Sequence, residues 1–332
     1  MTEESGASKA GARPASLAPR ALLAPGAGDA QPRACPLCGT DGQVRLYAEA
    51  NLGPAGLDGL SWESRKTPEL RHPRLLECRA CDLVFADPAP SPEKVQRGYE
   101  DAPFASGEES EYAARTYARL VGSLVDGLPD RKGALDVGTG DGAFLARLLA
   151  GGFTGVAGIE PSRAPREAAR SGVRELIRPG FFTGREFPPG SMRLVTCFMT
   201  LEHLPDPLAF CRAARALLKR DGVLLVAVHD RRALPNRVMG RRSPIFDVEH
   251  MQLFSPRSVA TMLSRAGYSG VRVWKYMNTY PFRYWIRLLP IPAAMKESLI
   301  RIVQSTGTGR LPLALPVGNM AAVAFNASGD NG

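Results

Sequence analysis

The chain of 332 residues is 44% hydrophobic and 23% charged, which is typical of a folded globular protein with room for one large and one small domain. No apolar run approaches the ~20 residues that a bilayer-spanning helix needs, so the composition excludes a helical membrane protein. The net charge is +9, and residues 231–310 hold 14 Lys and Arg against three acidic residues. This basic excess favours an anionic partner or substrate.

The N-terminal stretch, residues 1–33, is rich in Ala, Pro, Gly and Ser. Such a composition buries too little apolar surface to fold, so the stretch is predicted to be a disordered tail. It lacks the compact apolar core of a secretion signal, and Glu3 and Glu4 stand where such a signal would be basic. We therefore expect a cytoplasmic protein.

Two cysteine pairs predict that residues 34–92 form a small zinc-ribbon domain. Cys35 and Cys38 form one C-x-x-C motif, and Cys78 and Cys81 form the other. Each motif can place two thiolates on one turn, and two such turns complete a tetrahedral Zn²⁺ site. A redox-active dithiol is the alternative, although paired C-x-x-C motifs in an intracellular protein favour metal. Because four thiolates leave no open coordination position, this zinc is expected to be structural.

Residues 93–127 are predicted to be a linker and a capping helix between the ribbon and the main domain. The proline-rich segment at 87–92 is stiff, and apolar residues recur with helical spacing between Glu108 and Val125. The main domain is expected to occupy residues 128–332.

Strand and helix patterns alternate through the main domain. Strands are predicted at 134–137, 155–159, 173–177, 193–198, 222–228, 271–276 and 320–325, and helices at 142–150, 164–171, 207–219 and 256–266. This alternation predicts an α/β fold with a parallel sheet covered by helices on both faces. Ligands of such sheets bind beyond the carboxyl ends of the strands.

The first strand of this domain leads into a glycine-rich turn. Asp136 is followed by Gly138, Gly140 and Gly142, and then by a helical run. Glycine permits close approaches that a side chain would block, so a ligand can lie directly against this turn. The next strand ends in Glu160, where a carboxylate would bind the two hydroxyls of a ribose.

Four segments resemble, in order and spacing, the class I S-adenosylmethionine-dependent methyltransferases. They are D-V-G-T-G-D-G at 136–142, G-I-E-P-S at 158–162, L-E-H-L-P-D-P at 201–207 and L-L-K-R-D-G-V-L-L-V at 217–226. The resemblance covers half of the chain. It implies a Rossmann-like fold with a seven-stranded, mostly parallel sheet, and S-adenosylmethionine as the cofactor.

The resemblance also implies roles for the residues of the cofactor site. The three glycines would admit the methionine part of the cofactor, Asp136 would orient the turn or the ammonium group, and Glu160 would bind the ribose. Family members usually place an acidic or polar residue after the third strand for the adenine amino group. Here the strand is followed by Arg178-Pro179-Gly180, and then by Phe181 and Phe182. Adenine is therefore expected to rest on Phe181 or Phe182, or to use backbone groups.

Three of the four histidines are predicted to lie on the ligand face of the sheet. His203 follows the fourth strand, His229 follows the fifth, and His250 lies in the insertion after the fifth. A neutral imidazole is a suitable general base for an acceptor that must lose a proton. His229 and His250 rank above His203, whose L-E-H-L setting recurs in family members of differing chemistry. Glu249 and Asp230 are candidates to orient a histidine.

Two insertions, at 231–254 and 277–319, are expected to form the acceptor pocket, and both lie in the basic part of the chain. The second contains an aromatic stretch from Tyr280 to Trp285, for which stacking on an acceptor and burial as a lid are alternative interpretations. A third interpretation is a peripheral membrane contact through residues 280–301.

These features predict a methyltransferase that acts on a small-molecule acceptor, such as a sugar, a glycan or a secondary metabolite. The reaction would be an in-line displacement with a histidine as general base. The alternatives are an RNA methyltransferase and a non-catalytic zinc-ribbon scaffold. Nucleic acid is disfavoured because residues 34–92 are not notably basic, and the intact turn and Glu160 argue against the scaffold. The sequence leaves open the oligomeric state and whether oxygen, nitrogen or carbon is methylated.

Overall fold

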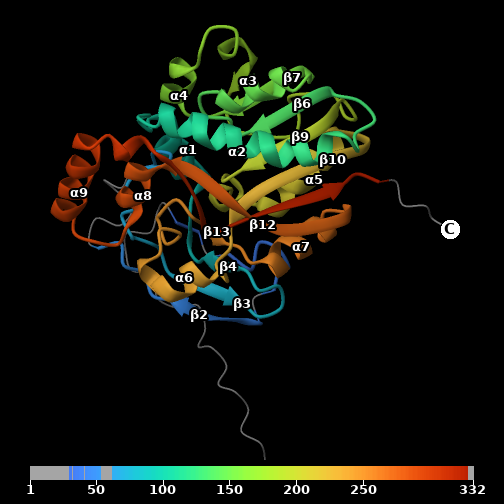
Figure 1. Ribbon diagram of the computed structural model, residues 1–332. Helices are drawn as coiled ribbons and strands as arrows, with labels where there is room; N and C mark the ends of the chain where they lie inside the picture. Colours follow the sequence, from blue (N-terminus) through green and yellow to red (C-terminus); the bar gives the residue numbers. More distant parts are fainter. Residues whose placement is uncertain (1–29, 32, 41, 54–61, 328–332) are drawn as a thin grey trace, which may run out of the picture.

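The computed structural model describes residues 30–31, 33–40, 42–53 and 62–327 (Figure 1). Most of the predicted tail lies outside these residues, but its last part differs from the expectation. Strand β1 (Ala30–Gln31) pairs with β5 (Ala89–Pro90), and the backbone N–H of Arg33 donates to Asp87 Oδ1 at 2.8 Å. Backbone pairing thus begins within the segment whose composition alone predicted disorder.

The main sheet has seven strands in the order β12-β13-β10-β9-β6-β7-β8. Strands β10, β9, β6, β7 and β8 are parallel, whereas β13 runs antiparallel to both of its neighbours, β10 and β12. The predicted seven-stranded, mostly parallel sheet is therefore confirmed. The strand bounds are Lys132–Val137 (β6), Thr154–Glu160 (β7), Ile177–Pro179 (β8), Met192–Phe198 (β9), Leu218–His229 (β10), Ser269–Pro281 (β12) and Pro312–Phe325 (β13).

Helices cover both faces of this sheet (Figure 1). One face carries α2 (Gly107–Val125) and α3 (Ala143–Ala150), and the other carries α5 (Pro207–Leu217) and α7 (Pro256–Arg265). Two shorter helices are α1 (Pro92–Glu100) and α4 (Arg163–Ala168). Both α5 and α7 begin with proline after a capping side chain, Asp206 or Ser255, which accepts a backbone N–H of the first turn.

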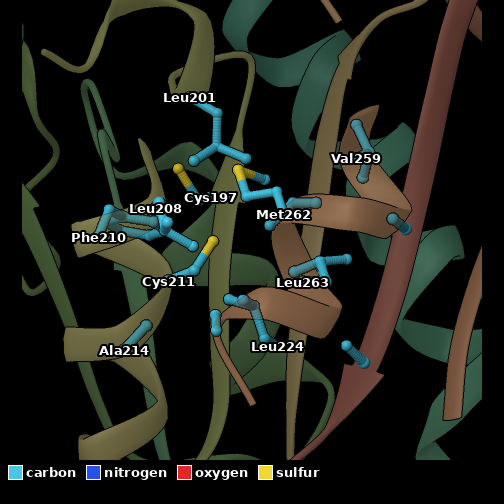
Figure 2. Close-up of a cluster of buried hydrophobic side chains, with 14 of the residues drawn as sticks. Cys197, Leu201, Leu208, Phe210, Cys211, Ala214, Leu224, Val259, Met262 and Leu263 are labelled. Carbon is cyan, nitrogen blue, oxygen red and sulfur yellow. The ribbon is translucent and has the colours of Figure 1, made fainter. Parts of the chain in front are cut away.

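The core beneath α5 and α7 contains the two cysteines that lie outside the C-x-x-C motifs (Figure 2). Cys197 on β9 and Cys211 on α5 are fully buried among apolar side chains that include Leu201, Met262 and Leu263. Both cysteines therefore act as small hydrophobic residues.

The strand predicted at 173–177 is wrong over most of its length. Residues Arg174–Leu176 form a 3₁₀ turn (η1), and β8 begins only at Ile177. A side chain added at Gly142 would meet Val173 at 2.5 Å and Ile177 at 3.1 Å. A tight turn brings these two residues to the same glycine, whereas a strand would hold them about 13 Å apart.

Strands β12 and β13 are much longer than the predicted strands at 271–276 and 320–325. Asn278–Pro281 pairs with Pro312–Leu315, so part of the expected 277–319 insertion is a two-stranded arm. The segment between the arm's strands forms α8 (Phe282–Leu288), α9 (Ala293–Ser305) and η4 (Thr308–Arg310). The arm's inward-facing residues alternate along β13, and they are Leu313, Leu315 and Val317. No described helix has the length and apolar character that crossing a bilayer requires.

The cysteine pairs belong to a second sheet, whose strand order is β11-β4-β3-β2. Strands β2 (Val44–Ala48), β3 (Leu75–Cys78) and β4 (Val84–Ala86) come from the predicted ribbon. Strand β11 (Gln252–Leu253), however, comes from the insertion after β10, and it pairs antiparallel with β4. The same insertion holds α6 (Leu234–Met239) and η3 (Gly240–Arg242). The ribbon and the first insertion are thus joined by shared backbone hydrogen bonds.

The four cysteines converge as their spacing predicts. Cys35 Sγ lies 3.5 Å from Cys81 Sγ, and Cys38 Sγ lies 3.4 Å from Cys78 Sγ. All four ligand atoms lie within 4.8 Å of one another, and none of these cysteines is in a disulfide. The four-cysteine cluster is confirmed.

A buried arginine joins the ribbon to the end of β10. Arg231 Nη2 lies 2.8 Å from Glu77 Oε1 and also contacts the carboxylate of Asp82. Only 3% of the Arg231 side chain and 4% of the Glu77 side chain are exposed. Burial alone would raise the pKa of Glu77, but hydrogen bonds from Arg45 and Arg231 hold it below its ordinary value. The hydrogen bonds within the pair therefore replace those that water makes to both charged groups in the unfolded chain.

We expect Arg231→Ala to lower the free energy of unfolding by about 2 kcal/mol or more, because it removes the buried arginine of the cluster and leaves only the more exposed Arg45 and Arg232 to pair with Glu77. Arg232→Ala is the matched control, since this neighbouring arginine contacts the same two carboxylates but is 52% exposed. Its loss should cost about 1 kcal/mol or less. Chemical denaturation measures the free energy of unfolding of both variants, and equal decreases in the two variants would contradict the prediction.

Candidate functional site

One cavity opens beyond the carboxyl ends of the parallel strands, where ligands of such sheets bind. Its lining includes all three predicted histidines. It also includes every predicted cofactor-site residue except Gly142, namely Asp136, Gly138, Gly140, Glu160 and Phe181. The structure thus brings the predicted cofactor and acceptor residues to a single space.

The glycine turn after β6 uses its three glycines in different ways, although all three have positive φ. A Cβ at Gly138 would lie 2.3 Å from Thr200 Oγ1, and one at Gly142 would lie 2.5 Å from Val173 Cγ1. A Cβ at Gly140 would meet no described atom within 4 Å. Gly138 and Gly142 therefore allow the turn to pack against the protein, and only Gly140 presents open backbone to a ligand.

Glu160 faces the glycine turn from the end of β7. Its Oε2 accepts the backbone N–H of Gly140 at 2.8 Å, and its Oε1 accepts that of Ser162 at 2.9 Å. The residue is 7% exposed, and burial raises the pKa of its carboxyl although both backbone hydrogen bonds oppose the shift. Since a carboxylate has about four acceptor sites, Glu160 can still accept hydrogen bonds from two ribose hydroxyls.

Asp136 ends β6 next to Glu160 and is also buried. Its Oδ1 accepts the hydroxyl of Thr196 on β9 at 2.6 Å. Burial raises the pKa of Asp136 to about 7, against the effect of that hydrogen bond. Asp136 therefore links two neighbouring strands beneath the turn while it lines the cavity.

The two phenylalanines expected to support adenine are differently placed. Phe182 packs edge-on against Phe210 of the core, with ring centroids 5.2 Å apart. Phe181 lines the cavity edge-on to Tyr99, at a centroid distance of 6.5 Å. Phe182 lines the same cavity, so support of adenine by either ring stays a prediction.

The three histidine rings form a continuous group in the cavity wall. The ring of His250 lies 4.9 Å from that of His203 and 5.3 Å from that of His229. Burial is the main cause that lowers the pKa of each, to about 3 for His229, to about 4 for His250 and well below the ordinary value for His203. All three imidazoles are therefore neutral at pH 7 and carry a lone pair.

Hydrogen bonds determine which ring nitrogen holds that lone pair. His250 Nδ1 lies 2.8 Å from the carbonyl oxygen of Ile245, and His229 Nδ1 lies 2.8 Å from Asn319 Oδ1. Both partners are acceptors, so each Nδ1 carries the proton and each Nε2 has the free lone pair. Asn319 is positioned by strand register, because it stands directly opposite His229 in the β10–β13 pair.

The two carboxylates expected to orient a histidine have different positions. Glu249 Oε2 lies 3.5 Å from His203 Nδ1, and Tyr99 Oη lies between them, 2.8 Å from Nδ1 and 3.3 Å from Oε2. Asp230 is wrong as a prediction, because its carboxylate accepts the backbone N–H of Arg232 at 2.8 Å and so stabilises the chain after β10.

Sequence reasoning missed the contribution of the ribbon to this cavity. The lining includes a ribbon segment, residues 63–66 with Pro68, as well as Tyr99 of α1. Lys66 Nζ lies 2.8 Å from Asp247 Oδ1 and 3.1 Å from Glu249 Oε1, so it ties this segment to the first insertion. This segment lies between the two cysteine pairs, and no local pattern of the sequence indicated that it would reach the cavity.

The aromatic stretch at the start of α8 is buried. Tyr280, Tyr284 and Trp285 pack on one another with centroid distances of 4.3 to 5.7 Å, and all three line the cavity. The interpretation as a buried lid therefore fits their positions better than an exposed membrane contact. The exposed large apolar side chains between residues 282 and 311 are Met295, Leu299 and Ile302 on α9, together with Leu289 and Leu311 outside it.

The sheet has seven strands with one antiparallel, a glycine turn follows β6, and a buried glutamate ends the neighbouring strand β7. Together these features define a class I S-adenosylmethionine-dependent methyltransferase. Comparison with known proteins leads to the same class. A family described as "Methyltransferase domain" matches residues 108–273, which is half of the chain. The chain belongs to this methyltransferase-domain family.

Curated relatives match over a shorter stretch. The chain is 35% identical over 126 residues to a ubiquinone biosynthesis O-methyltransferase of Histophilus somni, covering 35% of this chain and 52% of the relative. A protein of the same name from Neisseria meningitidis is 34% identical over 111 residues, covering 30% and 46%. The chain thus spans about half the length of these relatives. Among solved structures, the YcgJ protein of Bacillus subtilis aligns with a TM-score of 0.44 at 18% identity, covering 64% of this chain and 99% of that one.

We expect Glu160→Ala to weaken binding of S-adenosylhomocysteine by tenfold or more, because it removes a buried acceptor and leaves the Gly140 and Ser162 N–H groups unpaired. Isothermal titration measures the dissociation constant. Glu167→Ala is the control, because that carboxylate lies on the adjacent helix α4 and is 66% exposed. Unchanged affinity in the Glu160 variant would place the nucleoside elsewhere.

Proposed function

We propose that the chain transfers the methyl group of S-adenosylmethionine to an oxygen atom of a small polar acceptor, such as a sugar, a glycan or a secondary metabolite. The observation that carries this proposal is the single cavity in which the glycine turn and Glu160 face the same space as three neutral histidines. The relatives named as O-methyltransferases support oxygen as the atom that is methylated.

The residues on the cofactor side would hold the methyl donor. Open backbone at Gly140 would accept the methionine part, Glu160 would bind the ribose hydroxyls and Phe181 would support adenine. The sulfonium supplies an activated methyl group, and attack by the acceptor oxygen breaks the S–CH₃ bond to release S-adenosylhomocysteine. Alignment of the two reactants contributes much of the rate in such an in-line displacement.

The residues on the acceptor side would orient a hydroxyl and help it to lose its proton. His203, His229 and His250 are the candidates for that role, since all three line the cavity and a neutral imidazole nitrogen can accept a hydrogen bond from the hydroxyl. Amide groups of Asn278 and Asn319 add hydrogen-bonding capacity to the same lining. Polar groups beside aromatic rings suit a polyhydroxylated acceptor.

The charge pattern supports an anionic acceptor less strongly than the sequence predicted. Several arginines of the basic region are paired within the protein: Arg231 with Glu77 and Asp82, Arg283 with Glu108, and Arg287 with Glu109. An anionic acceptor and a peripheral membrane contact through 280–301 both stay predictions, as does the cytoplasmic location.

We expect a labelled methyl group from S-adenosylmethionine to appear on a small-molecule acceptor when the protein is incubated with a panel of sugars, nucleotide-linked sugars and phenols. Mass spectrometry would show the gain of one CH₂ group. Structured RNA is included in the panel, and label on RNA together with tight, salt-sensitive binding would favour the RNA methyltransferase instead. Failure to bind S-adenosylhomocysteine would leave only the scaffold.

We also propose that the four-cysteine cluster holds a structural Zn²⁺ ion, because four converging thiols form the donor set of closed zinc sites. Cys38→Ser is then expected to contain one equivalent of zinc less than the unmodified protein and to unfold at lower denaturant concentration. Metal analysis by mass spectrometry checks the first result. Equal zinc contents in the two proteins would contradict the assignment.

A further inference from the structure

Two of the cavity histidines belong to a second group of potential metal ligands, separate from the four cysteines. Glu202, His229 and His250 each place one ligating atom within 4.8 Å of the other two. Glu202 belongs to the 3₁₀ turn η2 (Leu201–His203) after β9, His229 ends β10, and His250 lies in the first insertion. Three segments distant in sequence thus converge beyond the carboxyl edge of the sheet.

The carboxylate of Glu202 lacks a partner for one of its oxygens. The residue is 2% exposed, and its Oε1 accepts the backbone N–H of His229 at 3.3 Å. Its Oε2 is buried without a hydrogen-bond partner among the described residues. A buried carboxylate oxygen left in this state costs free energy unless a cation or a donor satisfies it.

The two histidines are held in the tautomer that suits metal ligation through Nε2. Each ring donates its Nδ1 proton to a fixed acceptor, Asn319 Oδ1 for His229 and the Ile245 carbonyl for His250. This leaves two Nε2 lone pairs. Outer hydrogen bonds of this kind are typical of histidines that bind metal, because they fix the orientation of the ring and increase the basicity of the other nitrogen.

We propose that Glu202, His229 and His250 bind a catalytic divalent cation of the zinc type, which takes the acceptor hydroxyl as a further ligand. Two imidazole nitrogens and one carboxylate oxygen suit Zn²⁺ and related transition metals, whereas Mg²⁺ and Ca²⁺ prefer oxygen ligands alone. Three protein ligands leave a coordination position open, unlike the four-cysteine cluster. Both histidines line the cavity, so that position is accessible to an acceptor.

The role of this metal rests on the proposed methyl transfer and makes it more specific. The cation would lower the pKa of the bound acceptor hydroxyl, whose proton passes to water. The resulting oxygen attacks the methyl carbon, and the S–CH₃ electron pair stays on S-adenosylhomocysteine. His229 and His250 would then act through the metal rather than by taking the proton themselves. The favoured acceptors are those that present an oxygen able to bind a metal, such as a vicinal diol or an enol.

The test is a titration of the chelator-treated full-length protein with Co²⁺, followed by visible spectroscopy. We expect two equivalents in the unmodified protein, of which one gives the charge-transfer bands of a thiolate site. His250→Ala and Glu202→Gln should each bind one equivalent and keep the thiolate bands, whereas Cys38→Ser should lose those bands and keep the other site. A single equivalent in the unmodified protein, unchanged in both cavity variants, would overturn the proposal.

Binding of S-adenosylhomocysteine is measured in parallel, because it reports folding and the cofactor site without reference to the metal. Both cavity variants should retain it within a fewfold, since neither residue lies on the cofactor side. Methyl transfer that continues at full rate without the second cation would also overturn the metal's catalytic role. Conversely, a second metal equivalent without any methyl transfer would confirm the site and contradict the proposed function.

Discussion

The structure depends on a buried electrostatic contact between two parts of the chain that are far apart in sequence. Arg231 follows β10 of the main sheet, and its guanidinium is held by Glu77 and Asp82 of the ribbon. Unpaired, each of these charges would be costly in the interior, so the two parts must meet in one orientation. The added strand β11 continues this contact through backbone hydrogen bonds. Together they set the ribbon segment that contains Lys66 against the cavity.

The cavity itself follows from the direction of the strands. Parallel strands present their carboxyl ends at one edge, so Asp136, Glu160 and His229 meet there because each lies at the carboxyl end of a different strand. Hydrogen bonds between neighbours then fix the side chains: Glu160 is held by the backbone of the glycine turn, and His229 by Asn319 across the β10–β13 pair. The methyl-donor side and the acceptor side are therefore built by the same sheet.

The positions of most residues named for the cofactor could be predicted from the sequence, because these residues are local to strand ends and line one cavity. The glycine turn and Glu160 each lie at the end of a strand whose apolar pattern is clear, and the histidines could be assigned to the ligand face on the same grounds. Other features depend on packing between distant segments. The link from Tyr99 to His203, the unpaired oxygen of Glu202 and the pairing of β11 with β4 leave no periodic signal. The strand at 173–177 failed because contact with Gly142 outweighs the apolar pattern.

The long β12–β13 arm extends the main sheet beyond the strands that support the glycine turn. Residues 282–311 are attached to the arm at both ends, and the arm's outer hydrogen bonds lie beyond the strands that support the glycine turn. Insertions or exchanges in this segment would alter the wall formed by Tyr284 and Trp285 without disturbing the register of the main sheet. The wall and the glycine turn are therefore supported by different parts of the same sheet.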